Sequence, residues 1–170
     1  QEVEAIMQLF CRTVIGEGEE LAQQGVRVKI LGERTHFSAA VVEMIERIES
    51  VTAAGDRLTL VLAFNYSSRR EMMLAVRDIA SRVAAGEMAV EDITEQSISG
   101  ALMTANMPDP DFIIRTSGEC RLSNFLLWQA SYAEFYFPET LWPDFDEEAF
   151  DRALEVYAER DRRYGLVTED

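Results

Sequence analysis

The segment 58–64, LTLVLAF, narrows the choice of fold more than any other part of this 170-residue chain. Its apolar residues run almost without interruption, which is typical of a strand buried on both faces of a parallel sheet. A strand of this kind needs parallel neighbours and covering helices. We therefore expect segment 58–64 to lie at the centre of a sheet.

The rest of the chain alternates between helical and extended patterns. Extended patterns occur at 26–31, 58–64, 111–116 and 134–137, and helical patterns at 2–24, 38–53, 68–85, 94–103 and 146–162. This alternation predicts an α/β fold with a mainly parallel central sheet and helices on both faces. We find no internal repeat and no linker rich in Pro or Gly, so we expect a single domain over residues 1–170.

The charge and cysteine content argue against several classes of protein. Asp and Glu number 31 against 16 Lys and Arg, a formal net charge of -15, which repels nucleic acid. No apolar run approaches the roughly 20 residues of a membrane span. Only Cys11 and Cys120 are present, outside any zinc spacing, which suits a reducing compartment. We expect a soluble, cytoplasmic protein with no nucleic-acid partner.

Two loops that follow predicted strands have the composition of an anion site, because ligands of open α/β sheets bind beyond the carboxyl ends of the strands. The first, NYSSRRE at 65–71, leads into a helix, so its serines would cap that helix while free N–H groups and arginines face an anion. Plain N-capping with solvated arginines explains this first loop equally well.

The second loop, RTSGECRLSN at 115–124, is richer in anion-binding groups. Backbone amides near Gly118, the guanidinium groups of Arg115 and Arg121, and the Ser123 hydroxyl are predicted to converge on a diphosphate. Such a polar set at the end of a buried strand is costly without a ligand, so we favour a binding role for this loop.

Glu134 lies within the otherwise apolar and aromatic segment 131–137, SYAEFYF. A carboxylate in such surroundings needs a partner. Mg²⁺ beside a diphosphate and an ion pair with an arginine are both consistent with its position. His36, the only histidine, lies where a helix begins, and we expect it to cap the helix or lie at the surface.

Several of these segments together resemble the cis-prenyltransferases, the undecaprenyl diphosphate synthase family. The resemblance rests on IRTSGE, RLSNFLLWQ, YAEFYF, LWPDF and RRYG, which occur there in this order. NYSSRRE resembles the family's Asn-Tyr-Gly-Gly-Arg segment, and QEVEAIMQLF resembles the helix after its Ser-Glu-Asn-Trp loop. Essentially all 170 residues are covered.

The resemblance implies a homodimeric, Mg²⁺-dependent transferase that condenses isopentenyl diphosphate with an allylic diphosphate, usually farnesyl diphosphate, in cis geometry. The product would be a polyprenyl diphosphate, undecaprenyl diphosphate for cell-wall synthesis, released at a peripheral contact with the membrane. The residues matched to substrate binding are Asn65, Arg69, Arg115, Arg121, Ser123, Arg163 and Gly165, with Glu134 at the metal. The tail with Arg163 and Gly165 would reach the partner subunit's diphosphate site.

This chain departs from the family in two ways. The family's Asp-Gly-Asn-Gly-Arg-Trp loop, which supplies the catalytic aspartate, has no match in residues 1–170. We expect that loop upstream of Gln1, no catalytic residue within residues 1–170, and no activity from these residues alone. Cys120 also lies where many relatives have His, and a thiol does not replace imidazole as a metal or diphosphate partner.

Two other interpretations stay open at this point. A non-catalytic partner subunit of a cis-prenyltransferase dimer would keep the dimer surface and the RRYG tail. A general phosphate-binding α/β module would lack the apolar tunnel for the growing chain. We expect that tunnel to be lined by Met7, Phe10 and the strand at 58–64.

Overall fold

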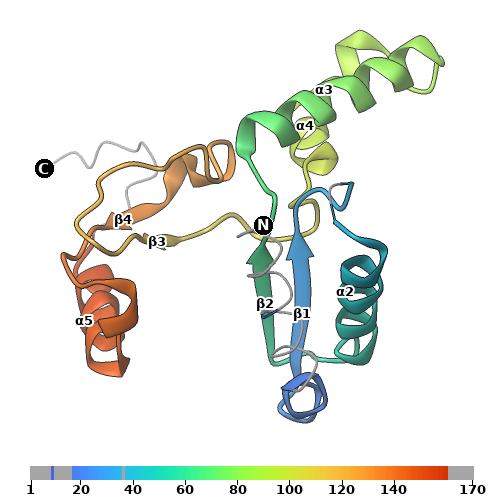
Figure 1. The fold of residues 1–170 in the computed structure, drawn as a ribbon. Helices are drawn as coiled ribbons and strands as arrows, with labels where there is room; N and C mark the ends of the chain where they lie inside the picture. Colours follow the sequence, from blue (N-terminus) through green and yellow to red (C-terminus); the bar gives the residue numbers. More distant parts are fainter. Residues whose placement is uncertain (1–8, 10–16, 36, 161–170) are drawn as a thin grey trace, which may run out of the picture. The chain divides into compact units, whose positions relative to one another are not determined.

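The computed structural model describes residue 9, residues 17–35 and residues 37–160 (Figure 1). The chain divides into two compact units, Gln1–Tyr66 and Ser67–Asp170, and each is described by itself. Both contain parallel strands and helices, which confirms the predicted α/β class. The single domain over residues 1–170 stays a prediction. In the described part, no helix is both long and apolar enough to cross a membrane.

The first unit is built on a strand, a helix and a second strand. Strand β1 (Val26–Leu31) pairs in parallel with β2 (Leu58–Ala63), and helix α2 (Ala39–Val51) connects them. The alternating apolar residues of β1 face those of α2, and the core residues are Val26, Val28, Ile30, Val41, Ile45 and Ile48. The predicted first helix is described at residue 9 and at residues 17–23, which are helical, and Met7 and Phe10 lie outside the described residues.

The expectation that β2 is buried on both faces is wrong for this unit. Five of its six residues are exposed, and only Leu62 is partly buried. The reason is that β1 is the only described strand paired with β2, while the core lies between β1 and α2. Leu62 and Phe64 reach that core only at its margin.

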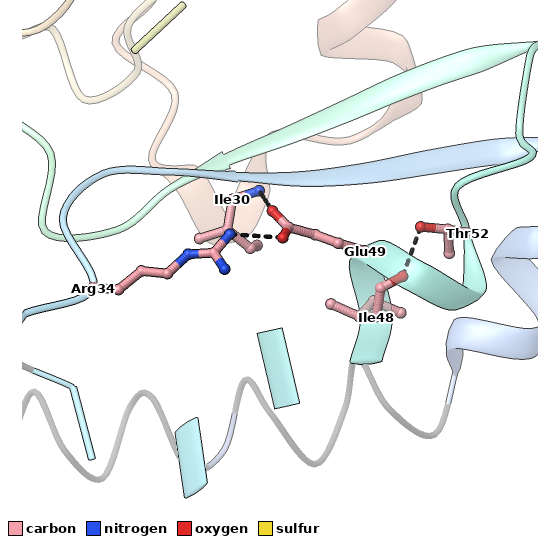
Figure 2. A network of polar contacts seen from close by, with 5 residues as sticks. All are labelled: Ile30, Arg34, Ile48, Glu49 and Thr52. Atoms are coloured by element: carbon pink, nitrogen blue, oxygen red, sulfur yellow. Dashed lines mark hydrogen bonds and ion pairs between the residues drawn. The ribbon is translucent and has the colours of Figure 1, made fainter. Parts of the chain in front are cut away.

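The outer edge of β1 is bonded to the side chains of Glu49 in α2 and of Thr52, the C-cap residue of α2, as Figure 2 shows in part. The N–H of Val28 donates to Thr52 Oγ1 (3.0 Å), and the N–H of Ile30 donates to Glu49 Oε1 (3.0 Å). The other oxygen of Glu49 accepts from Arg34 Nη2 at 2.6 Å. A residue of the last helical turn and the C-cap residue three positions later thus accept from N–H groups two positions apart on the strand.

The second unit contains α3 (Ser68–Ala84), α4 (Glu95–Ala101), β3 (Phe112–Ile114), β4 (Glu134–Tyr136) and α5 (Glu147–Ala158). Strands β3 and β4 pair in parallel, with Phe112 opposite Glu134. Tyr157 of α5 packs on Phe112 with ring centroids 4.9 Å apart. The Asp146 carboxylate caps α5. Helix α5 ends four residues before the predicted end at 162.

Candidate anion-binding site

The loop after β3 brings Arg115 and Ser123 together. The Arg115 N–H donates to the Tyr136 carbonyl (2.9 Å), which continues the pairing of β3 with β4 and fixes where the side chain starts. Its Nη1 donates to Ser123 Oγ (3.1 Å) and to the Arg121 carbonyl. The guanidinium of half-buried Arg115 therefore bonds to two later residues of the same loop, and the Ser123 hydroxyl lies next to it.

Two of the backbone amides predicted near Gly118 to face an anion, those of Ser117 and Gly118, are bonded within the chain instead. The Gly118 N–H donates to the Pro138 carbonyl and the Ser117 N–H to the Thr140 carbonyl, both at 2.8 Å. These two residues have left-handed backbones (φ 64 and 69), which turn the loop back onto the chain that leaves β4. Because these two donors are already paired, neither of them is available to an anion.

Arg121 is exposed and ion-paired. Its Nη1 contacts Glu119 Oε2, and its side chain is 62% exposed. An exposed pair of this kind is weak because water screens it. An anion with two charges can compete for Arg121, but Glu119 opposes its approach.

The N-terminus of α3 joins the same loop through Asn124. The Asn124 carbonyl accepts from the Ser68 N–H and its Oδ1 accepts from the Arg69 N–H, both at 2.8 Å. Ser67 occupies the N-cap position without a side-chain cap bond. The prediction that the serines cap α3 and leave free N–H groups is therefore wrong for this turn. The Arg69 guanidinium is exposed and makes no hydrogen bond or ion pair within the described part.

A buried polar cluster supports this turn from the inside. Glu71, only 1% exposed, accepts from Gln129 Nε2 (2.9 Å) and from the Met103 N–H (3.1 Å). Gln129 Nε2 also donates to Thr104 Oγ1 at 2.7 Å. The roles of Asn124, Glu71 and Gln129 were not predicted from the sequence. The residue type of Asn124 was informative, since Asn favours left-handed backbone and helix caps. The helix that it contacts, α3, begins 56 residues earlier in the chain, so the contact could not be predicted.

Glu134 lies at the start of β4 and its Oε2 is 3.9 Å from Arg160 Nε. The ion pair that was one of its two interpretations is thus present, although long. The described residues hold no cluster of three metal-ligating side chains. Mg²⁺ usually takes one or two carboxylates together with substrate phosphates. A single half-buried carboxylate fits that donor set.

The remaining predicted residues lie elsewhere or outside the description. Asn65 lies two residues after the end of β2 in the first unit, with a left-handed backbone (φ 49), and its Nδ2 donates to the Glu33 carbonyl at 2.9 Å. Cys120 is an exposed free thiol. His36, Arg163 and Gly165 lie outside the described residues.

Comparison with known proteins gives consistent matches over the whole chain. A family model described as "Putative undecaprenyl diphosphate synthase" matches residues 1–165. The isoprenyl transferase of Agrobacterium fabrum is 48% identical over 99% of this chain and 68% of its own length. The ditrans,polycis-undecaprenyl-diphosphate synthase ((2E,6E)-farnesyl-diphosphate specific) of Haemophilus ducreyi is 44% identical over 96% of this chain and 68% of its own length.

A solved structure is also similar. Lavandulyl diphosphate synthase from Lavandula x intermedia, in complex with dimethylallyl diphosphate, superposes with a TM-score of 0.93 at 34% identity. The superposition covers 97% of this chain and 72% of that one.

Proposed function

The chain belongs to the undecaprenyl diphosphate synthase family, the cis-prenyltransferases, and from this membership we propose that it condenses isopentenyl diphosphate with farnesyl diphosphate in cis geometry. The product is undecaprenyl diphosphate. The Haemophilus ducreyi relative, named for this product and for farnesyl diphosphate, supports the assignment. The observation on which the proposal depends is the contact of Arg115 with Ser123 beyond β3.

In this proposal Arg115, Ser123 and Arg121 bind the diphosphate of isopentenyl diphosphate. Arg115 supplies a half-buried guanidinium, whose planar fork matches phosphate oxygens better than an ammonium does. Ser123 adds a hydroxyl donor, since its oxygen already accepts from Arg115. Arg121 exchanges Glu119 for phosphate as the substrate arrives. The side chains hold the nucleophilic alkene in place without forming a bond to it.

Glu134 is the proposed carboxylate ligand of Mg²⁺. When bound, Mg²⁺ stabilises the charge that develops on the departing diphosphate of the allylic substrate. Glu134 would exchange its 3.9 Å contact with Arg160 for the metal, and its 29% exposure leaves the carboxylate accessible. Arg160 would then be released toward solvent or phosphate.

The proposal has further features, which the resemblance to the family suggests. Asn65 and Arg69 contribute to substrate binding, and Arg163 and Gly165 reach the diphosphate site of the partner in a homodimer. The protein acts in the cytoplasm and releases its product at the membrane surface. The exposed apolar side chains of the second unit, among them Tyr132 and Trp142, support a buried interface.

Calorimetry and condensation assays on the full native protein test this proposal. Arg115→Ala is expected to weaken isopentenyl diphosphate binding by roughly 2 to 4 kcal/mol, because a half-buried charged partner is lost. Arg121→Ala is expected to cost less, since Arg121 is exposed and paired. Arg82→Ala, at an exposed arginine of α3 that pairs with Asp78, is the matched control and should leave the affinity unchanged.

Two results would contradict the proposal. Unchanged affinity in Arg115→Ala would remove the loop after β3 from the site. Failure of the native protein to transfer labelled isopentenyl diphosphate into a butanol-extractable lipid, despite tight binding, would favour the non-catalytic partner subunit.

A further inference from the structure

Asn124 connects two segments that the proposed function assigns to substrate binding, the loop after β3 and the first turn of α3. It follows Ser123 directly, and both of its oxygens accept N–H groups from the first turn of α3. We propose that Asn124 is a positioning residue that holds Ser123 and Arg69 in one fixed arrangement for the diphosphate of isopentenyl diphosphate. This inference rests on the proposed function and adds a residue that makes no contact with substrate itself.

The backbone around Asn124 is held in a conformation that few residues adopt. Ser123, Asn124 and Leu126 all have positive φ, at 50, 65 and 46. Residues other than Gly in this region persist only where their surroundings impose it. Asn tolerates the conformation best because its side chain can bond locally. The bonds to α3 impose it here, and they direct Ser123 Oγ toward Arg115.

A second contact holds the same turn from the other side. Ser68, which is fully buried, accepts from the Leu127 N–H through its Oγ at 2.9 Å. Asn124 and Leu127, the two ends of segment 124–127, therefore both form hydrogen bonds with the first turn of α3. Because Ser68 is shielded from water, water does not compete for this bond.

These bonds determine which groups of the first turn of α3 can bind an anion. Asn124 Oδ1 occupies the Arg69 N–H, so that amide is unavailable to an anion. The Arg69 guanidinium is exposed and unbonded within the described part, so it is the group that can reach phosphate. If the bond from the Arg69 N–H to Asn124 Oδ1 is lost, Ser123 and Arg69 become free to move independently.

The variant Asn124→Gly isolates this role in the full native protein. Glycine tolerates the left-handed backbone and keeps the carbonyl that accepts from Ser68, while it removes the side chain and with it the Oδ1 bond to the Arg69 N–H. We expect the KM for isopentenyl diphosphate to rise about tenfold, the effect of one lost hydrogen bond, with kcat and the KM for farnesyl diphosphate changed less than about twofold. Exchange of the Arg69 amide hydrogen should also become faster.

Two further variants distinguish positioning from general stability. Asn124→Asp keeps the acceptor and should keep the Arg69 amide protected and the KM within about threefold of the native value. Asp146→Ala removes the 2.9 Å cap of α5 and should lower the melting temperature without changing the KM.

An unchanged KM in Asn124→Gly, with the native enzyme active, overturns this inference alone. Equal losses in Asn124→Gly and Asp146→Ala also overturn it, since they would indicate a purely structural role. No condensation by the native enzyme overturns the proposed function, and this inference with it.

Discussion

Gly32 lies where the loop after β1 meets the backbone of the loop after β2. Its φ is +130, and a Cβ at this position would lie 1.9 Å from the Phe64 carbonyl oxygen. Gly32→Ala is therefore expected to lower the free energy of unfolding by about 3 kcal/mol or more, because backbone strain and overlap add. Chemical denaturation measures this loss.

Gly100→Ala is the matched control for this substitution. Gly100 lies within α4, and nothing lies within 4 Å of the position its Cβ would take. Alanine there should stabilise the protein by about 0.5 to 1 kcal/mol. Equal effects of the two substitutions would show that the close approach at Gly32 is not a constraint.

The residues of the candidate site differ in how far they could be predicted from the sequence. Arg115 and Ser123 were predicted together, and the structure places them 3.1 Å apart, because both lie in one short loop after a strand. The amide of Gly118 was assigned to the ligand, but it pairs with the Pro138 carbonyl. A hydrogen-bond acceptor that lies in a distant part of the chain cannot be recognised from the residues around the donor.

Among the elements, the contact of β1 with α2 gives a test of edge bonding. Thr52 is fully buried, accepts from the Val28 N–H and donates to the Ile48 carbonyl (2.7 Å). Thr52→Val keeps the shape and leaves the Val28 N–H without its acceptor. We expect a loss of about 1 to 3 kcal/mol in the free energy of unfolding, measured by denaturant titration.

Thr59→Val on β2 controls for the change of residue type. Thr59 is exposed, so its substitution should change stability by less than about 0.5 kcal/mol. A Thr52→Val protein as stable as the native one would mean that the bond to Val28 contributes nothing.

Helices were predicted more reliably than the surroundings of strands. The predicted helices at 38–53, 68–85 and 94–103 contain α2, α3 and α4, because helix periodicity and caps are local properties. The pairing of β1 with β2 in parallel also follows from the strand, helix, strand order. The burial of 58–64 did not follow, since an apolar strand is buried only where other elements cover it.

For the whole molecule, a formal net charge of -15 opposes the approach of an anionic substrate at long range. Capture of a diphosphate therefore depends on a few guanidinium groups at short range. Salt screens the repulsion between exposed charges over roughly 8 to 10 Å, while the half-buried Arg115 is screened less. Local charge thus matters more than net charge for this protein.

A polypeptide of residues 1–170 alone is expected to transfer no isopentenyl diphosphate to farnesyl diphosphate. The resemblance to the family implies a catalytic aspartate in an Asp-Gly-Asn-Gly-Arg-Trp loop, a sequence that does not occur in residues 1–170. Loss of both positioning and charge stabilisation in one site costs many powers of ten in rate. Butanol extraction of radiolabelled product measures this, with the Agrobacterium fabrum isoprenyl transferase as the active control. Labelled lipid from residues 1–170 alone would contradict the prediction.

The side chains of Glu49 and Thr52 along β1 also determine the direction in which this sheet can be extended. An unpaired strand edge is a template on which another chain can add, in aggregation or in peptide capture. At β1 the Val28 and Ile30 amides are already bonded to α2, so an added strand would have to displace a buried hydroxyl and a carboxylate. Growth of the sheet is therefore one-sided, and any strand that joins it, from the same chain or another, must add beside β2.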